Sequence, residues 1–287
     1  PCGDYFTNLK TLWAAGDKEG IPDVLFLSPV FTYAGQGLLE PLDPFIKASG
    51  YNTSDYWPSL LDFGKLKGTI YGLPRDIGIE VLYYNKDIFD EAGVSYPTNF
   101  WTWDDLKAAA KQLSKINTSG RVQRYALGAE GGKYQLFLGQ NRGSILNDMV
   151  NPTACTLSEP VAVEAISFFA GLMDEKLAMR PSALSQAGGD AGVFQSGQAA
   201  MIIQNASRIS AFNAAKMNYD VAAVPIPAGG QRSGTAGGAA WTMSKYSDDK
   251  DTAWTFLSWL QSTEGGQMVY STSGEILPAL RSTAVSD

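Results

Sequence analysis

The chain has 287 residues, of which 45% are hydrophobic and 18% are charged, and its 22 basic and 29 acidic side chains give a formal net charge of −7. This apolar fraction can fill one or two domain cores and excludes intrinsic disorder, which requires low hydrophobicity and high charge. The acidic balance makes nucleic acid a poor partner, because the phosphate backbone needs a basic surface. No apolar run reaches the roughly 18 residues of a spanning helix, so we expect these residues not to cross a membrane.

The absence of histidine narrows the chemistry further. Without imidazole, the sequence excludes a Ser-His-Asp or Cys-His nucleophile system and a histidine metal site. Cys2 and Cys155 lack the spacing of a thiolate zinc site, and their spacing leaves open whether they pair as a disulfide. Cys2 with Gly3 resembles the end of a bacterial lipobox, although the apolar segment that precedes one is not in this sequence. We therefore expect no metal and no cofactor, and lipidation of Cys2 stays open.

Taken in chain order, helix and strand signals alternate. The first part predicts a helix at 4–15, a buried strand at 24–27, a loop at 28–33, a hairpin at 66–72 and a strand at 79–84. The second part predicts a helix at 103–116 capped by Thr102, a helix at 159–176 opened by Ser158, buried strands at 200–203, 219–224 and 239–243, and a helix opened by Ser247 with Phe256 facing inward. Alternation of this kind predicts an α/β fold.

Two polar segments have simple structural interpretations. The Gly-rich stretch at 228–238 lacks the Gly-Lys-Ser/Thr ending of a phosphate-binding loop and opens no helix, so we expect a hairpin loop or a close approach of backbone to a ligand. Asp248, Asp249 and Asp251 lack the spacing and the closing glutamate of an EF-hand. These aspartates are better explained as a capped, solvated helix start.

Arg75 and Asp76 are stronger candidates for a site. They follow Pro74 at the end of a strand, where open α/β sheets place their ligands, although a structural ion pair is an equal alternative. Aromatic residues beside polar or Gly-rich loops suit either rim packing or a binding platform, and they are Phe31, Tyr33, Tyr134 and Trp241. Asp76 and Glu80 lie near one strand, but no signal marks them as the acid and nucleophile of a glycosidase.

A series of segments in fixed order then carries a family resemblance. They read IPDVLF at 21–26, GLLEPL at 37–42, GTIYGLP at 68–74, LYYNKDIF at 82–89, EAG at 91–93, WDDL at 103–106, FQSGQAAM at 194–201, GG at 237–238 and GEILPA at 274–279. Each is weak alone, but their order and spacing extend over nearly the whole chain. On these segments the chain resembles a family 1 extracellular solute-binding protein of an ABC importer, the maltose-binding-protein-like class.

The resemblance implies a two-lobe, type II periplasmic-binding-protein-like α/β fold, with lobes joined by hinge crossovers and a ligand cleft between them. It assigns residues 1–82 and 226–273 to the N-terminal lobe, and residues 83–225 and 274–287 to the C-terminal lobe. Members of the family begin with a strand, helix and strand before the position of Pro1 and end with helices beyond Asp287. The sequence is therefore expected to be incomplete at both ends.

The resemblance also implies a set of ligand-binding residues. These are Ser28, Phe31, Tyr33, Arg75, Asp76, Tyr134, Gln135, Asn205, Arg208, Gly237, Gly238 and Trp241. Such a set suits a sugar, because aromatic faces stack on the apolar side of a pyranose while carboxylates, amides and arginine bind its hydroxyls. One departure weakens a maltose-like assignment: Ser207 stands where the family often has a tryptophan, and the neighbouring Arg208 leaves room for an anionic ligand such as a uronate or a phosphorylated polyol.

The function implied by the resemblance is that of a non-catalytic, monomeric receptor. It would capture a carbohydrate by hinge closure and deliver it to the permease subunits of an ABC importer, with no nucleic-acid partner. The expected location is outside the cytoplasmic membrane of a bacterium or archaeon, either periplasmic or lipid-anchored. Two alternatives stay open: the same fold binding a polyamine, peptide or phosphorylated polyol, and, more remotely, a secreted glycan-active enzyme.

Overall fold

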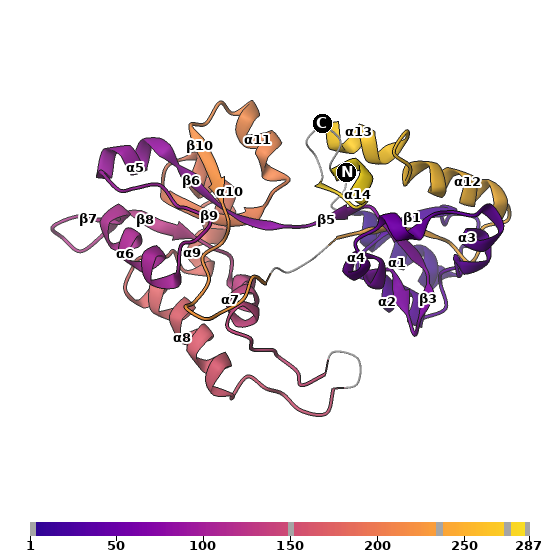
Figure 1. Ribbon diagram of the computed structural model, residues 1–287, viewed down its shortest axis with the longest axis horizontal. Helices are drawn as coiled ribbons and strands as arrows, with labels where there is room; N and C mark the ends of the chain where they lie inside the picture. Colours follow the sequence, from indigo (N-terminus) through magenta and orange to yellow (C-terminus); the bar gives the residue numbers. More distant parts are fainter. Residues whose placement is uncertain (1–3, 149–151, 234–237, 273–276, 285–287) are drawn as a thin grey trace. The chain divides into compact units, whose positions relative to one another are not determined.

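The computed structural model describes residues 4–148, 152–233, 238–272 and 277–284 (Figure 1). The chain divides into two compact units, unit 1 with residues 1–78 and 236–287, and unit 2 with residues 79–235. Each unit has its own sheet and its own hydrophobic cores. Among the described helices, none combines the length and the hydropathy that crossing a membrane requires.

Unit 1 is built around a three-stranded sheet in the order β1-β11-β4, in which β11 runs antiparallel to both neighbours. Its described elements are α1 (Tyr5–Ala15), β1 (Val24–Leu27), α2 (Val30–Gly35), α3 (Asp43–Ser49), η2 (Thr53–Asp55), α4 (Pro58–Phe63), β2 (Lys65–Leu66), β3 (Thr69–Ile70), β4 (Gly72–Pro74), β5 (Asp76–Ile77), β11 (Ala240–Met243), α12 (Lys250–Leu260), α13 (Gly266–Thr272), β12 (Leu277–Pro278) and α14 (Arg281–Ala284). Two smaller pairings, β12-β5 and β2-β3, complete the unit.

The two faces of the unit 1 sheet belong to different cores, because side chains alternate along a strand. Leu25 and Leu27 of β1 are fully buried in the core that also contains Leu9 of α1 and residues of α2. Trp254 of α12 packs in the other core with Met243 of β11. Helices therefore cover both faces, which holds the strand ends in fixed positions.

Unit 2 contains a five-stranded sheet in the order β10-β6-β9-β8-β7, with β8 and β9 parallel and the other pairs antiparallel. Its described elements are β6 (Glu80–Asn85), α5 (Lys86–Ala92), α6 (Trp103–Leu113), β7 (Lys115–Ile116), β8 (Val122–Gly128), η3 (Gly131–Lys133), α7 (Tyr134–Gln140), α8 (Pro160–Asp174), α9 (Pro181–Gln186), α10 (Gly189–Gln195), β9 (Ala199–Asn205), α11 (Arg208–Ala214) and β10 (Tyr219–Ala222). This mixed sheet with helices confirms the predicted α/β class.

The unit 2 sheet also has a helical layer on each face (Figure 1). Leu82 and Tyr84 of β6 lie in the core formed with α5, α6, α7 and α8. Tyr83, between them, faces the opposite core with Phe194 of α10 and Phe212 of α11. Its ring meets that of Phe212 edge-on, with centroids 5.1 Å apart.

Local signals located most elements well. Thr102 caps α6, and its side chain and that of Asp105 form a reciprocal capping box. The helix ends at Leu113 and not at 116, because Lys115 and Ile116 instead pair with β8. The expected helix start among the acidic residues is confirmed, since the Asp249 side chain accepts a hydrogen bond from the backbone N–H of Thr252, 3.0 Å away.

Other local predictions were wrong. The predicted loop at 28–33 contains α2, because Val30, Tyr33 and Ala34 share one buried helical face. Glu159 is the N-cap of α8 in place of Ser158, and Asp249 is the N-cap of α12 in place of Ser247.

The prediction that Phe256 faces inward is wrong, and the possible disulfide between Cys2 and Cys155 stays untested. Phe256 is 50% exposed and does not face inward, because the core positions of α12 are taken by Trp254 and its i+3 neighbour Leu257. Cys155 is exposed and forms no disulfide with any residue within the described ranges, whereas Cys2 lies outside those ranges.

The division into units differs from the lobes expected from the resemblance. The first boundary follows residue 78 and not residue 82, because Glu80 already begins the sheet of unit 2. The second follows residue 235 and not residue 225, since Gln231 hydrogen-bonds through its backbone N–H to Gln140. The described part of the terminal segment, residues 277–284, falls in unit 1, because Leu277 and Pro278 pair with β5.

Candidate functional site

One end of the unit 1 sheet brings several of the predicted residues together. Because β1 and β4 both run antiparallel to β11, they are parallel to each other, and the register aligns Leu27, Ala240 and Pro74 across the sheet. Ser28 therefore leaves the sheet at the same edge as Arg75. The carboxyl ends of parallel strands are where open α/β sheets hold their ligands.

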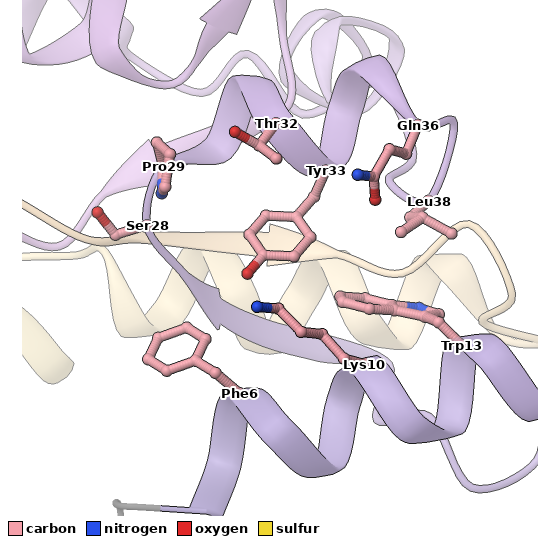
Figure 2. A pocket seen from close by; sticks show the side chains of 9 residues that line it. All are labelled: Phe6, Lys10, Trp13, Ser28, Pro29, Thr32, Tyr33, Gln36 and Leu38. Carbon is pink, nitrogen blue, oxygen red and sulfur yellow. The ribbon is translucent and has the colours of Figure 1, made fainter.

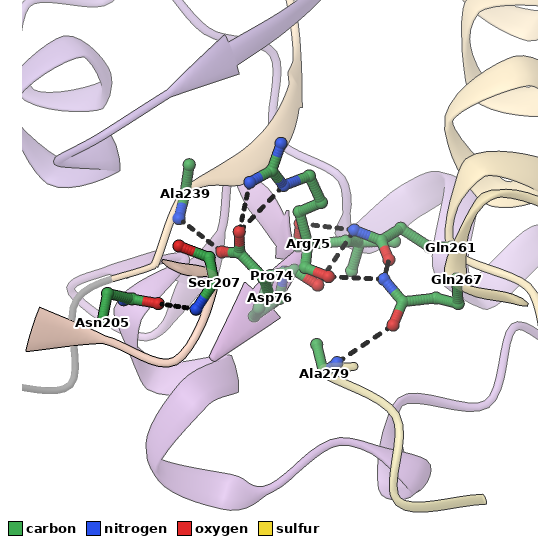
Figure 3. Close-up of polar contacts among 10 residues, drawn as sticks. Pro74, Arg75, Asp76, Asn205, Ser207, Ala239, Gln261, Gln267 and Ala279 are labelled. Atoms are coloured by element: carbon green, nitrogen blue, oxygen red, sulfur yellow. Dashed lines mark hydrogen bonds and ion pairs between the residues drawn. The ribbon is translucent and has the colours of Figure 1, made fainter. Parts of the chain in front are cut away.

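Arg75 and Asp76 form an ion pair at this edge (Figure 3). The Nε of Arg75 donates to Oδ2 of Asp76 over 3.0 Å, and a second guanidinium nitrogen donates to the same oxygen. The other oxygen, Oδ1, accepts from the backbone N–H of Ala239 at 3.1 Å. Asp76 therefore ties the start of β5 to the segment before β11, which is the structural role left open as the alternative.

The backbone of Gly238 explains part of this arrangement. A Cβ atom at Gly238 would lie only 2.5 Å from the carbonyl oxygen of Asp76. Glycine is required for such a close approach of two backbone segments. The Gly-rich stretch thus packs against Asp76 at this point, while the neighbouring Gly237 lies outside the described residues.

Two buried glutamines fix the segment that carries the ion pair (Figure 3). The Nε2 of Gln261 donates to the carbonyl oxygens of Leu73 and Pro74, at 3.1 and 2.9 Å. The Nε2 of Gln267 donates to the Arg75 carbonyl oxygen and to Oε1 of Gln261, both at 2.6 Å. These bonds hold three successive carbonyl groups and so fix the direction in which Arg75 leaves the sheet.

An apolar cavity of about 550 Å³ adjoins Arg75. It is lined by Tyr5, Phe6, Pro22, Val24, Phe26, Arg75, Trp241 and Tyr270. The Arg75 guanidinium lies over the Phe26 ring, 4.4 Å from its centroid, and the Phe26 and Trp241 centroids are 5.4 Å apart. Burial raises the pKa of the Tyr5 hydroxyl, while the hydrogen bond that it accepts from the Phe26 backbone acts in the opposite direction. The cavity thus combines ring faces with a paired cation.

Ser28 and Tyr33 line a different cavity, of about 560 Å³ (Figure 2). Tyr33 reaches from α2 toward α1, where its ring centroid lies 5.2 Å from that of Trp13. Phe31 lines neither of these two cavities and is 51% exposed, because it lies on the α2 face opposite the buried one. The unit 1 candidates therefore separate into two groups, and the aromatic group at Arg75 includes rings that the sequence did not single out.

The unit 2 sheet has a comparable edge. The parallel strands β8 and β9 end at Gly128 and Asn205, and β6 begins at Glu80, directly opposite Asn205. The turn η3 after β8 and the segment after β9 consequently start at one end of the sheet. By the same topological rule, this is where unit 2 would contact a ligand.

The predicted residues of unit 2 cluster around this edge with different exposures. Tyr134 begins α7 and is half-buried against the core, whereas Gln135 beside it is exposed. The side-chain oxygen of Asn205 accepts from the backbone N–H of Ser207 at 2.9 Å, which shapes the turn into α11 (Figure 3). Arg208, the first residue of α11, is exposed.

Sequence reasoning named Glu80 but missed Lys133 and the buried ion pair that the two residues form at this edge. Lys133 of η3 donates to Oε1 of Glu80, and the two side chains are 11% and 10% exposed. The only sequence signal was a glutamate at the start of an otherwise apolar strand, two positions before Leu82 on the same face. Lys133 lies far from Glu80 in the chain, so the pairing could not be read from spacing.

Comparison with known proteins identifies the family of this chain. Residues 1–267 match the family model described as "Bacterial extracellular solute-binding protein". The chain belongs to this family. This match confirms the resemblance to extracellular solute-binding proteins that the ordered sequence segments indicated.

Three relatives illustrate the family. A Brucella abortus protein named only as a binding protein is 30% identical over 79% of this chain and 55% of its own length. A maltooligosaccharide ABC transporter solute-binding lipoprotein of Streptococcus pneumoniae is 25% identical over 96% of this chain and 64% of its own. An ABC substrate-binding protein of Listeria monocytogenes, solved in complex with cycloalternan, is 30% identical with a TM-score of 0.85, covering 99% of this chain and 72% of that one.

The solved Listeria structure confirms the expected fold class for this solute-binding protein. The sequence of 287 residues spans only 55% to 64% of the two curated relatives.

Proposed function

We propose that the protein is the substrate-binding receptor of an ABC importer and that its solute is a carbohydrate. Family membership supports the receptor role, and the ligands named for the Streptococcus and Listeria relatives support the carbohydrate. The observation that carries the proposal is the edge of unit 1, where the rings of Phe26 and Trp241 adjoin the Arg75–Asp76 pair. Ring faces and charged hydrogen-bonding groups together match the apolar and hydroxyl surfaces of a sugar.

In this proposal the receptor does not change its solute chemically. Binding energy shifts the population toward a closed form that the permease subunits recognise, with a cytoplasmic ATPase reached through them. A glycan-cleaving enzyme is a weaker alternative, because Asp76 already bonds Arg75 through one carboxylate oxygen and Ala239 through the other. We further propose a monomer without cofactor, located outside the cytoplasmic membrane in the periplasm or at a lipid anchor.

One exposed cation in unit 2 favours a second class of solute. Arg208 is exposed at the start of α11, beside the edge of unit 2. An exposed guanidinium suits a phosphorylated polyol or a uronate, since arginine binds such anions through paired hydrogen bonds. Polyamines and peptides serve as comparison ligands.

The test is a ligand panel measured by thermal unfolding and then by calorimetry. The panel contains cycloalternan, maltotriose, mannobiose, glucuronate, glycerol 3-phosphate, spermidine and a tripeptide. A ligand at 100 times its dissociation constant stabilises the folded protein by about 2.7 kcal/mol, which raises the melting temperature by several degrees. Stabilisation by a sugar supports the proposal. If only a ligand of another class stabilises the protein, the proposed receptor role stands and the proposal that the solute is a carbohydrate is refuted.

A further inference from the structure

Glu80 and Lys133 form a buried ion pair at the edge of unit 2. Glu80 is the first residue of β6 and Lys133 the last residue of η3, and both side chains are about nine-tenths buried. Lys133 Nζ donates to Oε1 of Glu80. The lysine thereby neutralises the carboxylate and fixes its orientation, which makes Lys133 a positioning residue.

The second carboxylate oxygen of Glu80 is not accounted for by this pairing. Oε2 is buried and has no hydrogen-bond partner within the part of the chain that the structure describes. A carboxylate has acceptor positions on both oxygens, and a buried acceptor left without a partner is strongly disfavoured. Some donor that is not part of the described chain is therefore expected at Oε2.

The position of Glu80 favours a ligand as that donor. Its register partner is Asn205, the last residue of β9, and η3 follows the parallel strand β8. Oε2 thus belongs to the sheet edge where the carboxyl ends of parallel strands lie, and where Tyr134 supplies a ring.

We propose that Oε2 of Glu80 accepts a hydrogen bond from a hydroxyl group of a neutral, polyhydroxylated solute. This inference rests on the proposed receptor function and names the charge class of its ligand. Lys133 and Glu80 neutralise each other, as do Arg75 and Asp76 at the edge of unit 1. The unpartnered carboxylate oxygen can only accept a hydrogen bond, so a hydroxyl donor is favoured there, whereas a ligand carboxylate or phosphate brings a further acceptor and is disfavoured.

The test compares the wild type with Glu80→Gln by calorimetry, using cycloalternan, maltotriose and mannobiose as probes. The glutamine amide puts either an N–H donor or an uncharged oxygen where Oε2 of Glu80 lies. The affinity for the bound sugar should therefore fall about 10- to 100-fold. Glu159→Gln is the matched control, because Glu159 is exposed and directly precedes α8, outside the segments that follow β8 and β9. It should leave the affinity within twofold.

Glu80→Gln leaves Lys133 without its anionic partner, so Glu80→Gln/Lys133→Met is measured beside it. The double variant removes both charges at similar volume and should show the same loss of affinity. If neither variant folds, monodeoxy analogues of the bound sugar are titrated against the wild type. One missing hydroxyl should then cost at least about tenfold, and losses below threefold at every position would overturn the inference.

The outcomes separate the two proposals. If the wild type binds no sugar of the panel, the proposed carbohydrate function fails and this inference fails with it. If the wild type binds a sugar and the folded Glu80 variants bind it equally well, the function stands and the inference is refuted, with a buried water as the donor at Oε2. A higher affinity of the wild type for glucuronate than for neutral sugars would also refute it.

Discussion

Replacing Gln267 by leucine should both destabilise unit 1 and weaken solute binding. The side chain is fully buried and joins three groups: the carbonyl of Arg75, Oε1 of Gln261 and the backbone N–H of Ala279. The distances are 2.6, 2.6 and 3.0 Å, so all three are well-formed hydrogen bonds. Leucine has a similar size and can form none of them.

The magnitude follows from the groups left behind. Each buried polar group that loses its partner destabilises the folded state by about 1 to 3 kcal/mol, so three such groups give about 3 to 6 kcal/mol after partial relaxation. For a protein of this size, each kcal/mol lowers the melting temperature by roughly 2 to 4 °C. The variant should therefore unfold at least about 6 °C below the wild type.

Thermal unfolding followed by far-ultraviolet circular dichroism measures this change, and calorimetry at a temperature where both proteins are folded measures sugar binding. Gln112→Leu on α6 is the control, because Gln112 is exposed and the hydrogen bond that its side chain donates to the Ala108 carbonyl is long, at 3.5 Å. The control should unfold within about 1 °C of the wild type, as expected for surface substitutions.

A Gln267→Leu protein that unfolds within 2 °C of the wild type would refute the reasoning. It would mean that water or local movement replaces the amide at little cost. A destabilised variant that still binds sugar normally would refute only the claim that Gln267 positions Arg75, and would leave its structural role in place.

Three shorter predictions concern the site and the pH dependence of stability. Trp241→Ala should weaken sugar binding at least about tenfold by calorimetry while unfolding stays cooperative, because it removes a ring face from the cavity beside Arg75. Asp76→Ala should weaken binding and lower the melting temperature as well, since it removes the bond between the start of β5 and the segment before β11; unchanged affinity in both variants would exclude this edge as the site. Hydrogen bonds from Lys115 and then Arg124 lower the pKa of Glu91 from 4.5 to about 2, so their stabilising effect is complete above pH 4.5 and disappears as the pH falls toward 2. The melting-temperature difference between wild type and Glu91→Gln should shrink over this interval, and a constant difference would contradict the assignment.

Local sequence signals predicted what short-range physics decides. The capping box at Thr102 and Asp105 involves residues three positions apart, so the start of α6 could be read directly. The end of that helix could not, because the pairing of Lys115 with Arg124 depends on β8 lying beside it. The same limit applies to α2, whose buried face exists only because α1 and β1 cover it.

The sequence by itself determined the α/β class and the family, and it named Arg75 and Asp76 as candidates, because strand ends and ordered segments are visible along the chain. The tertiary structure alone decided which groups surround them. Gln267 reaches the Arg75 carbonyl from 192 positions away, and Lys133 meets Glu80 across 53 positions. Such contacts are set by how helices pack on the two sheets, and packing of that kind leaves no periodic mark in the sequence.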